Sequence, residues 1–278
     1  MTYDSIPGTR VAIVEMPPRR KPLHAVLDMD GTLSLLRDGW QDAMVPMMVE
    51  VLESCPTHEP REDLERLVID FVDHLTGKQT IYQMLRLAEE VRARGGVPAD
   101  PLEYKDEYHR RLSFLIAERH RSVRDGRASP EEFLVPGARE FLSALQERGV
   151  HCYLASGTDI EFVREECRLL GIDKFFDGEI HGALREYQRF SKEMVIRSII
   201  EKHGLEGPEL LIVGDGFVEI VNGREVGATA FGLHTRENNR YHMNADKESR
   251  LVRAGAHLLA PDLIEGAKVL DWLSSAPS

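Results

Sequence analysis

Apolar residues follow two different spacings along this chain, and the change between them marks a change of structure. Short, mainly apolar runs at residues 24–27, 150–155 and 210–213 indicate buried strands. Between residues 39 and 129 the apolar positions instead recur every three or four residues, which is the spacing of amphipathic helices. Four such helical stripes begin at Trp40, Leu64, Ile81 and Tyr104. The pattern therefore predicts a sheet of buried strands that a helical segment interrupts.

From residue 136 onward, strand patterns alternate with helical ones. We expect helices over residues 159–170 and 192–203, strands near residues 228–233 and 256–259, and a helix or loop over 248–253 between those strands. Strands that alternate with helices form βαβ units, whose strands pair in parallel. The predicted fold class is therefore α/β, with a doubly wound, mainly parallel sheet and an inserted all-α segment.

Capping signals set the expected ends of the two helices. Thr158 and Glu161 have the spacing of a capping box before the first helix, and Gly171 follows its last turn. Ser191 is the expected N-cap of the second helix, which ends before Gly204.

These patterns divide the chain into three parts. Residues 1–22 form an N-terminal extension, whose strand-like run at 10–14 predicts an edge strand or an arm. Residues 23–36 and 135–278 form the α/β core, and residues 37–134 form the helical insertion. One interpretation of the insertion is a dimerisation module, so a homo-oligomer is one expectation.

Composition narrows the possible partners. The chain has 278 residues, with 47 acidic and 35 basic ones and a net charge of −12. This balance argues against a general affinity for nucleic acid or an anionic membrane. No apolar run approaches the roughly 20 residues that span a bilayer, and no signal peptide is visible, so we expect a cytoplasmic location. The cysteines Cys55, Cys152 and Cys167 lack metal-ligand spacing and are interpreted as structural thiols.

The strongest chemical signal is a pair of carboxylates, Asp28 and Asp30, directly after the predicted strand at 24–27. Ligands of open α/β sheets bind beyond the carboxyl ends of the strands. One carboxylate there could attack a substrate while the other transfers protons. Because Asp followed by Asp-Gly is also common in turns, a purely structural turn is the alternative.

Three further polar groups follow at the ends of predicted elements. Ser156 and Gly157 end the apolar run at 150–155, and Asp215 ends the run at 210–213, with Glu219 four residues later. Lys192 opens a predicted helix, where a cation opposes the helix dipole unless an anion lies nearby.

With these motifs in this order, the chain resembles the haloacid dehalogenase superfamily from about residue 23 to its C-terminus. The family motifs are Asp-x-Asp-Gly-Thr, a strand-terminal Ser or Thr, a Lys, and Gly-Asp-x-x-x-Asp. Glu219 stands where the family more often has Asp. The resemblance implies that the helical insertion is a C1 cap, which opens and closes over the core site.

The resemblance also implies a role for each motif residue. Asp28 would be the nucleophile that forms an aspartyl-phosphate, and Asp30 the general acid and base. Ser156, the Gly157 amide and Lys192 would bind the phosphoryl group. Mg²⁺ would be held by the Asp28 carboxylate, the Asp30 main-chain carbonyl and Asp215, with Glu219 close by or acting through water.

Asp30 favours one chemistry of the superfamily, because a leaving alkoxide needs a proton whereas a leaving halide does not. The resemblance therefore implies a Mg²⁺-dependent phosphatase that acts on a small phosphorylated metabolite, with a sugar phosphate as the default. A phosphomutase and a catalytically silent binding protein of the same fold are the alternatives.

Two regions of the insertion are candidates for substrate contact. Residues 76–80 break two predicted helices with a glycine, and Lys78 and Gln79 make this segment a candidate specificity loop, with a solvated turn as the alternative. The basic stretch at residues 109–127 is interpreted as a solvated helix face. A weaker possibility is that one of its arginines binds a second anionic group of the substrate.

Overall fold

The computed structural model describes residues 3–236 and 247–275, and its core is an eight-stranded sheet with the order β1-β2-β8-β7-β6-β3-β4-β5. The strands are β1 (Asp4–Ser5), β2 (Ala12–Ile13), β3 (His24–Leu27), β4 (His151–Asp159), β5 (Ile180–Ala183), β6 (Leu210–Gly214), β7 (Thr229–Leu233) and β8 (Leu258–Ala260). The strands from β3 to β8 pair in parallel, whereas β1 and β2 pair antiparallel at one edge. The predicted run at residues 10–14 therefore contains a strand, β2, but the edge of the sheet is formed by β1, which was not predicted.

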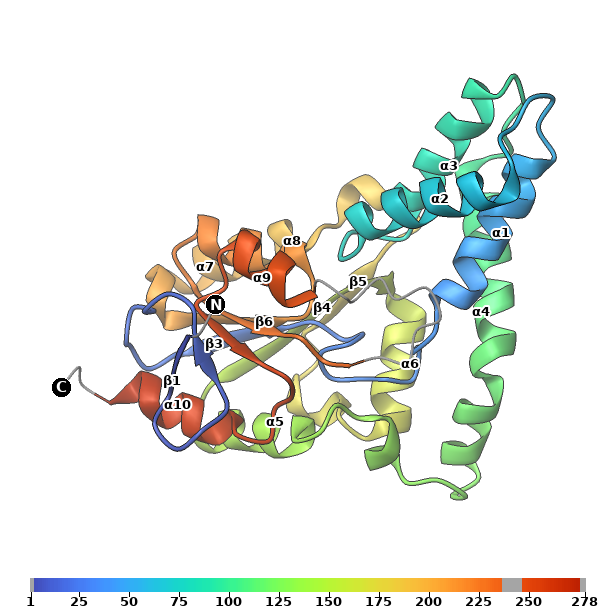
Figure 1. Cartoon of the computed structure of the whole chain (residues 1–278). Helices are drawn as coiled ribbons and strands as arrows, with labels where there is room; N and C mark the ends of the chain where they lie inside the picture. The colour runs from blue at the N-terminus through green and yellow to red at the C-terminus, as the bar shows by residue number, and fades with distance from the viewer. Residues whose placement is uncertain (1–2, 237–246, 276–278) are drawn as a thin grey trace.

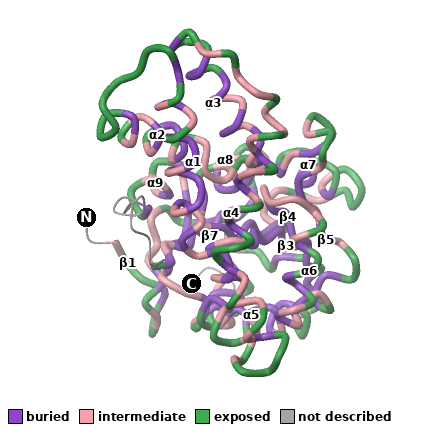
Figure 2. The backbone as a smooth tube through the Cα atoms, turned by 90° about the vertical axis from the view of Figure 1, so that its right-hand side faces the viewer, coloured by how far each residue is buried: buried purple, intermediate pink, exposed green. Residues whose placement is uncertain are grey.

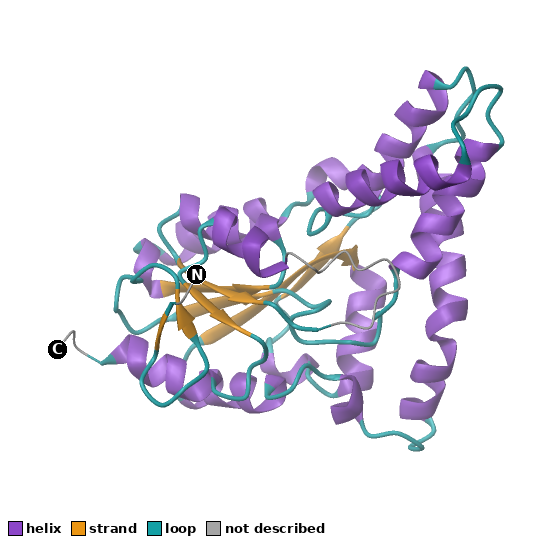
Figure 3. Ribbon diagram, in the orientation of Figure 1, coloured by secondary structure: helices purple, strands orange, loops and turns teal. Residues whose placement is uncertain are grey.

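Helices cover both faces of this sheet, as Figures 1 and 3 show. They are α5 (Ala138–Glu147), α6 (Ile160–Leu170), α7 (Lys192–His203), α8 (Phe217–Glu225), α9 (Lys247–Ala254) and α10 (Gly266–Ser274). Alternate residues of β3 serve the two layers, because Ala25 and Leu27 pack in one apolar cluster with Phe141 of α5, and Val26 packs in another with Ile196 of α7. Figure 2 shows the central strands as buried. The doubly wound α/β prediction is confirmed.

The helical stripes of the insertion fold into four helices with an apolar core of their own. These are α1 (Gln41–Glu53), α2 (Arg61–Leu75), α3 (Ile81–Ala93) and α4 (Pro101–Arg124). Met44, Met48, Leu64, Val68 and Met84 lie in this core, each no more than 1% exposed. Figure 1 shows α4 descending beside α6, so the cap is joined to the core along one side as well as above the sheet.

The predicted capping box at Thr158 is wrong, although the helix that it introduces is present. Strand β4 continues through Thr158, α6 begins at Ile160, and its N-cap Asp159 makes no side-chain capping bond. The Thr158 hydroxyl instead donates a hydrogen bond to Asp30 Oδ2 at 2.9 Å. The Asp30 carboxylate, from a distant segment of the chain, therefore binds the Thr158 hydroxyl that the local pattern assigned to the start of the helix.

The other predicted helix ends are confirmed. Ser191 Oγ accepts a hydrogen bond from the Met194 amide at 3.1 Å, which caps α7. Gly171 and Gly204 end α6 and α7 with φ angles of 63° and 61°, in the left-handed region that favours glycine. Among the described residues, no helix combines the length and the apolar character needed to cross a membrane.

Candidate active site

Asp28 lies at the carboxyl edge of the sheet, where its strand β3 runs between β4 and β6. Its amide donates to the Val213 carbonyl of β6 at 3.0 Å, and its Oδ1 accepts from the Met29 amide at 2.8 Å. The side chain is only 9% exposed. Burial raises the pKa of Asp28 well above its ordinary value, and the charge of Lys192 opposes this effect.

Lys192 brings its buried ammonium group to two carboxylates at once. Its Nζ lies 2.9 Å from Asp28 Oδ2 and 3.0 Å from Glu219 Oε2. Burial disfavours the charged form, but the two carboxylates outweigh it and raise the pKa of Lys192 above its ordinary value. The cation at the start of α7 is thus held by anions, as its unfavourable position in the helix dipole suggested.

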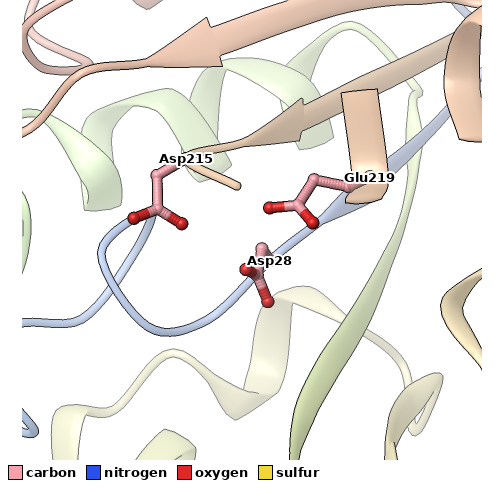
Figure 4. Close-up of side chains that lie close together, drawn as sticks. All are labelled: Asp28, Asp215 and Glu219. Atoms are coloured by element: carbon pink, nitrogen blue, oxygen red, sulfur yellow. The ribbon is translucent and has the colours of Figure 1, made fainter. Parts of the chain in front are cut away.

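Asp28, Asp215 and Glu219 form a carboxylate cluster in which one oxygen atom of each side chain lies within 4.8 Å of one oxygen atom of each of the other two. Figure 4 shows the three side chains turned toward a shared space. Oxygen donors of this kind are the ligands that Mg²⁺ prefers, so the residues fit a magnesium site.

Two glycines make room for the longer side chain of Glu219. A Cβ atom at Gly214 would overlap Glu219 Cγ, and one at Gly216 would lie 2.8 Å from Glu219 Oε1. The Gly216 amide donates to that Oε1 at 2.8 Å. Glu219 is therefore accommodated by the backbone beneath it rather than pushed out of the cluster.

Asp30 contacts Thr158 of β4 and Arg37 of its own loop. Besides the bond from Thr158, its Oδ1 lies 3.8 Å from Arg37 Nε, and this oxygen has no hydrogen-bond partner in the described part of the chain. Burial raises the pKa of Asp30 to about 6, and the charge of Arg37 opposes the rise. A carboxyl group with such a pKa can both hold and release a proton near neutral pH.

Arg37, which the sequence analysis did not single out, continues this contact into the core and the cap. Its Nε donates to Glu166 Oε1 of α6 at 2.9 Å, and both side chains are nearly fully buried. His120 Nε2 of α4 lies 3.5 Å from the same Glu166 oxygen. The buried pair therefore links the loop after β3 with α6 and α4.

Ser156 and Gly157 line the same pocket as Asp28 and lie within the last four residues of β4, which extends beyond the strand end predicted at residue 155. Ser156 Oγ accepts a hydrogen bond from the Thr158 amide at 3.1 Å, which leaves the hydroxyl hydrogen to donate elsewhere. A Cβ atom at Gly157 would lie 2.6 Å from the carbonyl oxygen of Lys78. Glycine thus allows the loop of residues 76–80 to contact the core directly above the site.

A pocket between core and cap contains these groups. From the core it is lined by Asp28, Asp30, Ser156, Gly157, Lys192 and Asp215, and from the cap by Trp40, Gln41, Met44, Lys78, Gln83 and Tyr108. Gln41 is 3% exposed, and within the described residues its Oε1 lacks a hydrogen-bond partner. A hydroxyl or amine of a bound molecule would satisfy this oxygen.

The two candidate specificity residues differ in their positions. Lys78 is exposed and lines the pocket, whereas Gln79 is buried and is not one of the lining residues. Gln79 Nε2 donates to the Tyr187 carbonyl at 3.0 Å and to the Phe190 carbonyl at 2.6 Å. The Gln79 amide thus joins the cap loop to the core.

The arginines of residues 109–127 do not reach the pocket, so the predicted clamp from this stretch is wrong. Arg110, Arg121, Arg124 and Arg127 are more than half exposed and pair with glutamates at the surface, which confirms a solvated helix face.

Two basic residues of α9 were missed as well. Lys247 is 4% exposed, and its Nζ lies 2.5 Å from Asp215 Oδ2. Arg250, one turn later, pairs with Asp73 of the cap. Both line the pocket. Neither residue belongs to a sequence motif, because a contact between segments that are distant along the chain leaves no local sequence pattern.

Fold and site together define a class of protein: an α/β core whose polar sheet edge is covered by a helical cap. The model of the haloacid dehalogenase-like hydrolase family matches residues 24–227, and the chain belongs to this family.

Relatives and solved structures agree with this assignment. The chain is 29% identical over 103 residues to a 5'-nucleotidase of Pseudomonas aeruginosa, covering 37% of this chain and 46% of that protein. It is 25% identical over 126 residues to a phosphoglycolate phosphatase of Vibrio vulnificus, covering 45% and 55% of the two chains. The chain thus spans about half the length of these relatives.

A Haemophilus somnus structure described as a predicted phosphoglycolate phosphatase superposes with a TM-score of 0.59 at 20% identity, covering 90% of this chain and 98% of that one. A predicted phosphatase of Clostridium acetobutylicum gives 0.58 at 17%, covering 90% and 99%. These likenesses concern the fold.

Proposed function

We propose that the chain is a Mg²⁺-dependent phosphatase that hydrolyses a small phosphorylated metabolite through an aspartyl-phosphate. The observation that carries the proposal is the position of Lys192 Nζ, 2.9 Å from Asp28 Oδ2 in a pocket that also contains Asp30 and Asp215. A nucleophilic carboxylate, a fixed cation and a second carboxyl of raised pKa are the groups that phosphoryl transfer needs. The names of the relatives, a nucleotidase and phosphatases, support the same chemistry.

In the first step, an Asp28 carboxylate oxygen attacks the phosphorus atom while the bond from phosphorus to the leaving oxygen breaks. Asp30 gives its proton to that oxygen, so the leaving group departs as an alcohol. The Ser156 hydroxyl, the Gly157 amide and the Lys192 ammonium bind the phosphoryl oxygens during transfer.

In the second step, Asp30, now a carboxylate, takes a proton from water as the water oxygen attacks phosphorus. The bond between phosphorus and Asp28 breaks, which releases inorganic phosphate and restores the Asp28 carboxylate. Asp30 can serve in both roles because its pKa is about 6.

The carboxylates of Asp28 and Asp215, the main-chain carbonyl of Asp30 and, directly or through water, Glu219 would hold Mg²⁺. When bound, the ion supplies positive charge that reduces the repulsion between a carboxylate nucleophile and a phosphate dianion.

Residues 37–134 act in this proposal as a cap that closes over the pocket and excludes water. Contacts that hold the cap against the core include the amide of Gln79 on core carbonyls, the bond from Arg119 to the Leu36 carbonyl at 2.9 Å, and the ion pair of Arg250 with Asp73. Opening of the cap would admit the substrate and release the product.

A phosphate-release assay with Mg²⁺ tests the proposal. The panel contains sugar phosphates, nucleoside monophosphates and phospho-acids, phosphoglycolate among them, and Asp28→Asn is the blank. We expect release from at least one substrate without an added bisphosphate, and none from the variant. A requirement for a bisphosphate activator would indicate a mutase instead, and a flat result over the whole panel would contradict the proposal.

A further inference from the structure

We propose that Arg37 and Glu166 form a positioning pair for Asp30, the proton donor of the proposed reaction. Arg37 holds the Asp30 carboxyl in the orientation that proton transfer to the leaving oxygen needs, and Glu166 holds Arg37 in place. Neither Arg37 nor Glu166 reacts with the substrate. The inference rests on the proposed phosphatase function and adds two residues to it.

The two oxygen atoms of the Asp30 side chain have different neighbours. Oδ2 accepts the hydrogen bond from the Thr158 hydroxyl at 2.9 Å, and Arg37 Nε lies 3.8 Å from Oδ1. The second distance is too long for a hydrogen bond, and Oδ1 accepts none from any residue that the structure describes. A hydrogen bond thus orients one oxygen of the carboxyl, and a nearby positive charge orients the other.

Arg37 directs its hydrogen bonds to Glu166 of α6 instead. Its Nε lies 2.9 Å from Glu166 Oε1 and 3.1 Å from Oε2, and its Nη2 lies 2.9 Å from Oε1. The guanidinium carbon also lies 5.4 Å from the centre of the Phe162 ring. These contacts fix the guanidinium at a distance from Asp30 where it attracts the carboxyl without binding it in a hydrogen-bonded ion pair.

The burial of the pair needs an explanation other than stability. The side chains of Arg37 and Glu166 are only 8% and 2% exposed. Removing two charges from water cancels much of their attraction, so an apolar pair of similar size often stabilises a protein equally well or better. The position of the pair beside Asp30 explains why charges occur here.

A direct contact between Arg37 and the substrate is the alternative, because Arg37 also lines the pocket. The two roles predict different kinetics. A residue that binds substrate changes the Kd of every ester. A residue that positions Asp30 instead changes the rate of phosphoryl transfer, and only with leaving groups that need a proton.

Single-turnover kinetics with Mg²⁺ and the enzyme in excess separate these roles, because the leaving group departs in the first step. The esters are phenyl phosphate, whose leaving group needs a proton, and 2,4-dinitrophenyl phosphate, whose leaving group does not. The rate constant at saturating enzyme reports the transfer step, and its dependence on enzyme concentration gives Kd. If only a member of the earlier panel is hydrolysed, that ester replaces phenyl phosphate, and acetyl phosphate replaces the dinitrophenyl ester.

The variants are Arg37→Met alone and the double variant Arg37→Met/Glu166→Leu. The double variant removes both charges, so it leaves no unpaired buried charge to prevent folding. Arg124→Gln is the matched control, because Arg124 of α4 is exposed and pairs with Glu165 of α6, the neighbour of Glu166, at 3.0 Å. Circular dichroism verifies that each variant is folded, and Asp30→Asn gives the loss when the proton donor is absent.

We expect the double variant to lose at least about tenfold in the transfer rate constant with phenyl phosphate, and to keep most of it with the dinitrophenyl ester. Arg37→Met should show the same selectivity, and Arg124→Gln should match the wild type with both esters. In the Asp30→Asn background the double change should cause no further loss with phenyl phosphate, because the group that the pair positions is gone.

Four results would overturn the positioning role and leave the phosphatase intact. They are an undiminished rate constant with phenyl phosphate, equal losses with both esters, a loss confined to Kd, and a further loss in the Asp30→Asn background. A wild-type enzyme that releases neither a phenol from the two esters nor phosphate from any member of the panel would instead overturn the proposed function.

Discussion

The hydroxyl of Thr158 donates a hydrogen bond to Asp30 Oδ2 across 2.9 Å, which joins the end of β4 to the loop after β3. Because the Thr158 amide also donates to Ser156 Oγ, one residue orients both the proposed acid and a proposed phosphate ligand. Thr158 therefore positions groups on two strands that meet at the carboxyl edge of the sheet.

Replacement of Thr158 by valine should lower kcat roughly tenfold, because Asp30 loses a hydrogen bond that orients its carboxyl, and should lower the free energy of unfolding by about 1–3 kcal/mol. Thr158→Ser retains the hydroxyl and is expected to retain most of both quantities. Steady-state kinetics and urea unfolding of the two variants check this. Equal kcat in the valine and serine variants would contradict the positioning role.

Lys192→Met should be destabilising by about 3–5 kcal/mol, because it leaves Asp28 and Glu219 buried without their cation. Phosphate release should fall at least about a hundredfold, the usual effect of removing a preorganised charge. Lys202→Met is the control on the same helix, and its exposed pair with Glu179 should contribute less than about 1 kcal/mol. Similar unfolding free energies for the two variants would refute the interpretation of Lys192.

Mg²⁺ should stabilise the folded protein, since only the folded chain gathers the oxygen atoms of Asp28, Asp215 and Glu219. At a concentration of 100 times its Kd the ion should add about 2.7 kcal/mol to the free energy of unfolding. Thermal unfolding with Mg²⁺ and with a chelator measures the effect. Asp215→Asn should abolish it, and Asp271→Asn, a change at an exposed residue of α10, should preserve it. An unchanged Tm in the wild-type protein would exclude this site.

Acid should destabilise the protein through His24, a buried residue at the amino end of β3, the end opposite to Asp28. Burial, followed by the charges of His203 and His151, lowers the pKa of His24 from 6.5 to about 4; Lys202 also lowers it, whereas Glu209 raises it. Between these two pKa values the unfolded chain binds a proton that the folded chain does not, so stability falls as the pH decreases through this window.

Urea unfolding at pH 7 and pH 5 tests the prediction, with His24→Phe as the variant that keeps a ring against His203 but cannot titrate. We expect the difference in unfolding free energy between the two pH values to be smaller in the variant. Identical differences would show that His24 does not contribute.

The sequence identified those site residues that lie close to the end of a regular element. Asp28, Ser156 and Asp215 each follow an apolar run, and parallel pairing of β3, β4 and β6 brings the ends of those runs together. Lys192 follows a clear N-cap. Period and capping chemistry were therefore sufficient to predict the fold class, whereas the prediction that these four residues share one site came from the resemblance of their motifs to those of the family.

Other contacts have no local signal. Arg37 finds Glu166, and Lys247 finds Asp215, only because the packing of whole helices brings distant segments together. Thr158 was misassigned because its hydroxyl can bind either the nearby helix start or the Asp30 carboxylate, and in the folded chain it binds Asp30. Such choices depend on the assembled structure, so sequence spacing alone could not decide them.

The central claim is that Asp28 accepts the phosphoryl group. A substrate labelled with ³²P in the ester, once the assay has identified one, is mixed with the enzyme and Mg²⁺, quenched in acid within the first turnover and digested. We predict an acid-stable, hydroxylamine-sensitive label on the peptide that contains Asp28, and none in Asp28→Asn. Phosphate release by the wild-type enzyme with the label on another peptide, or undiminished release by the variant, would contradict the account.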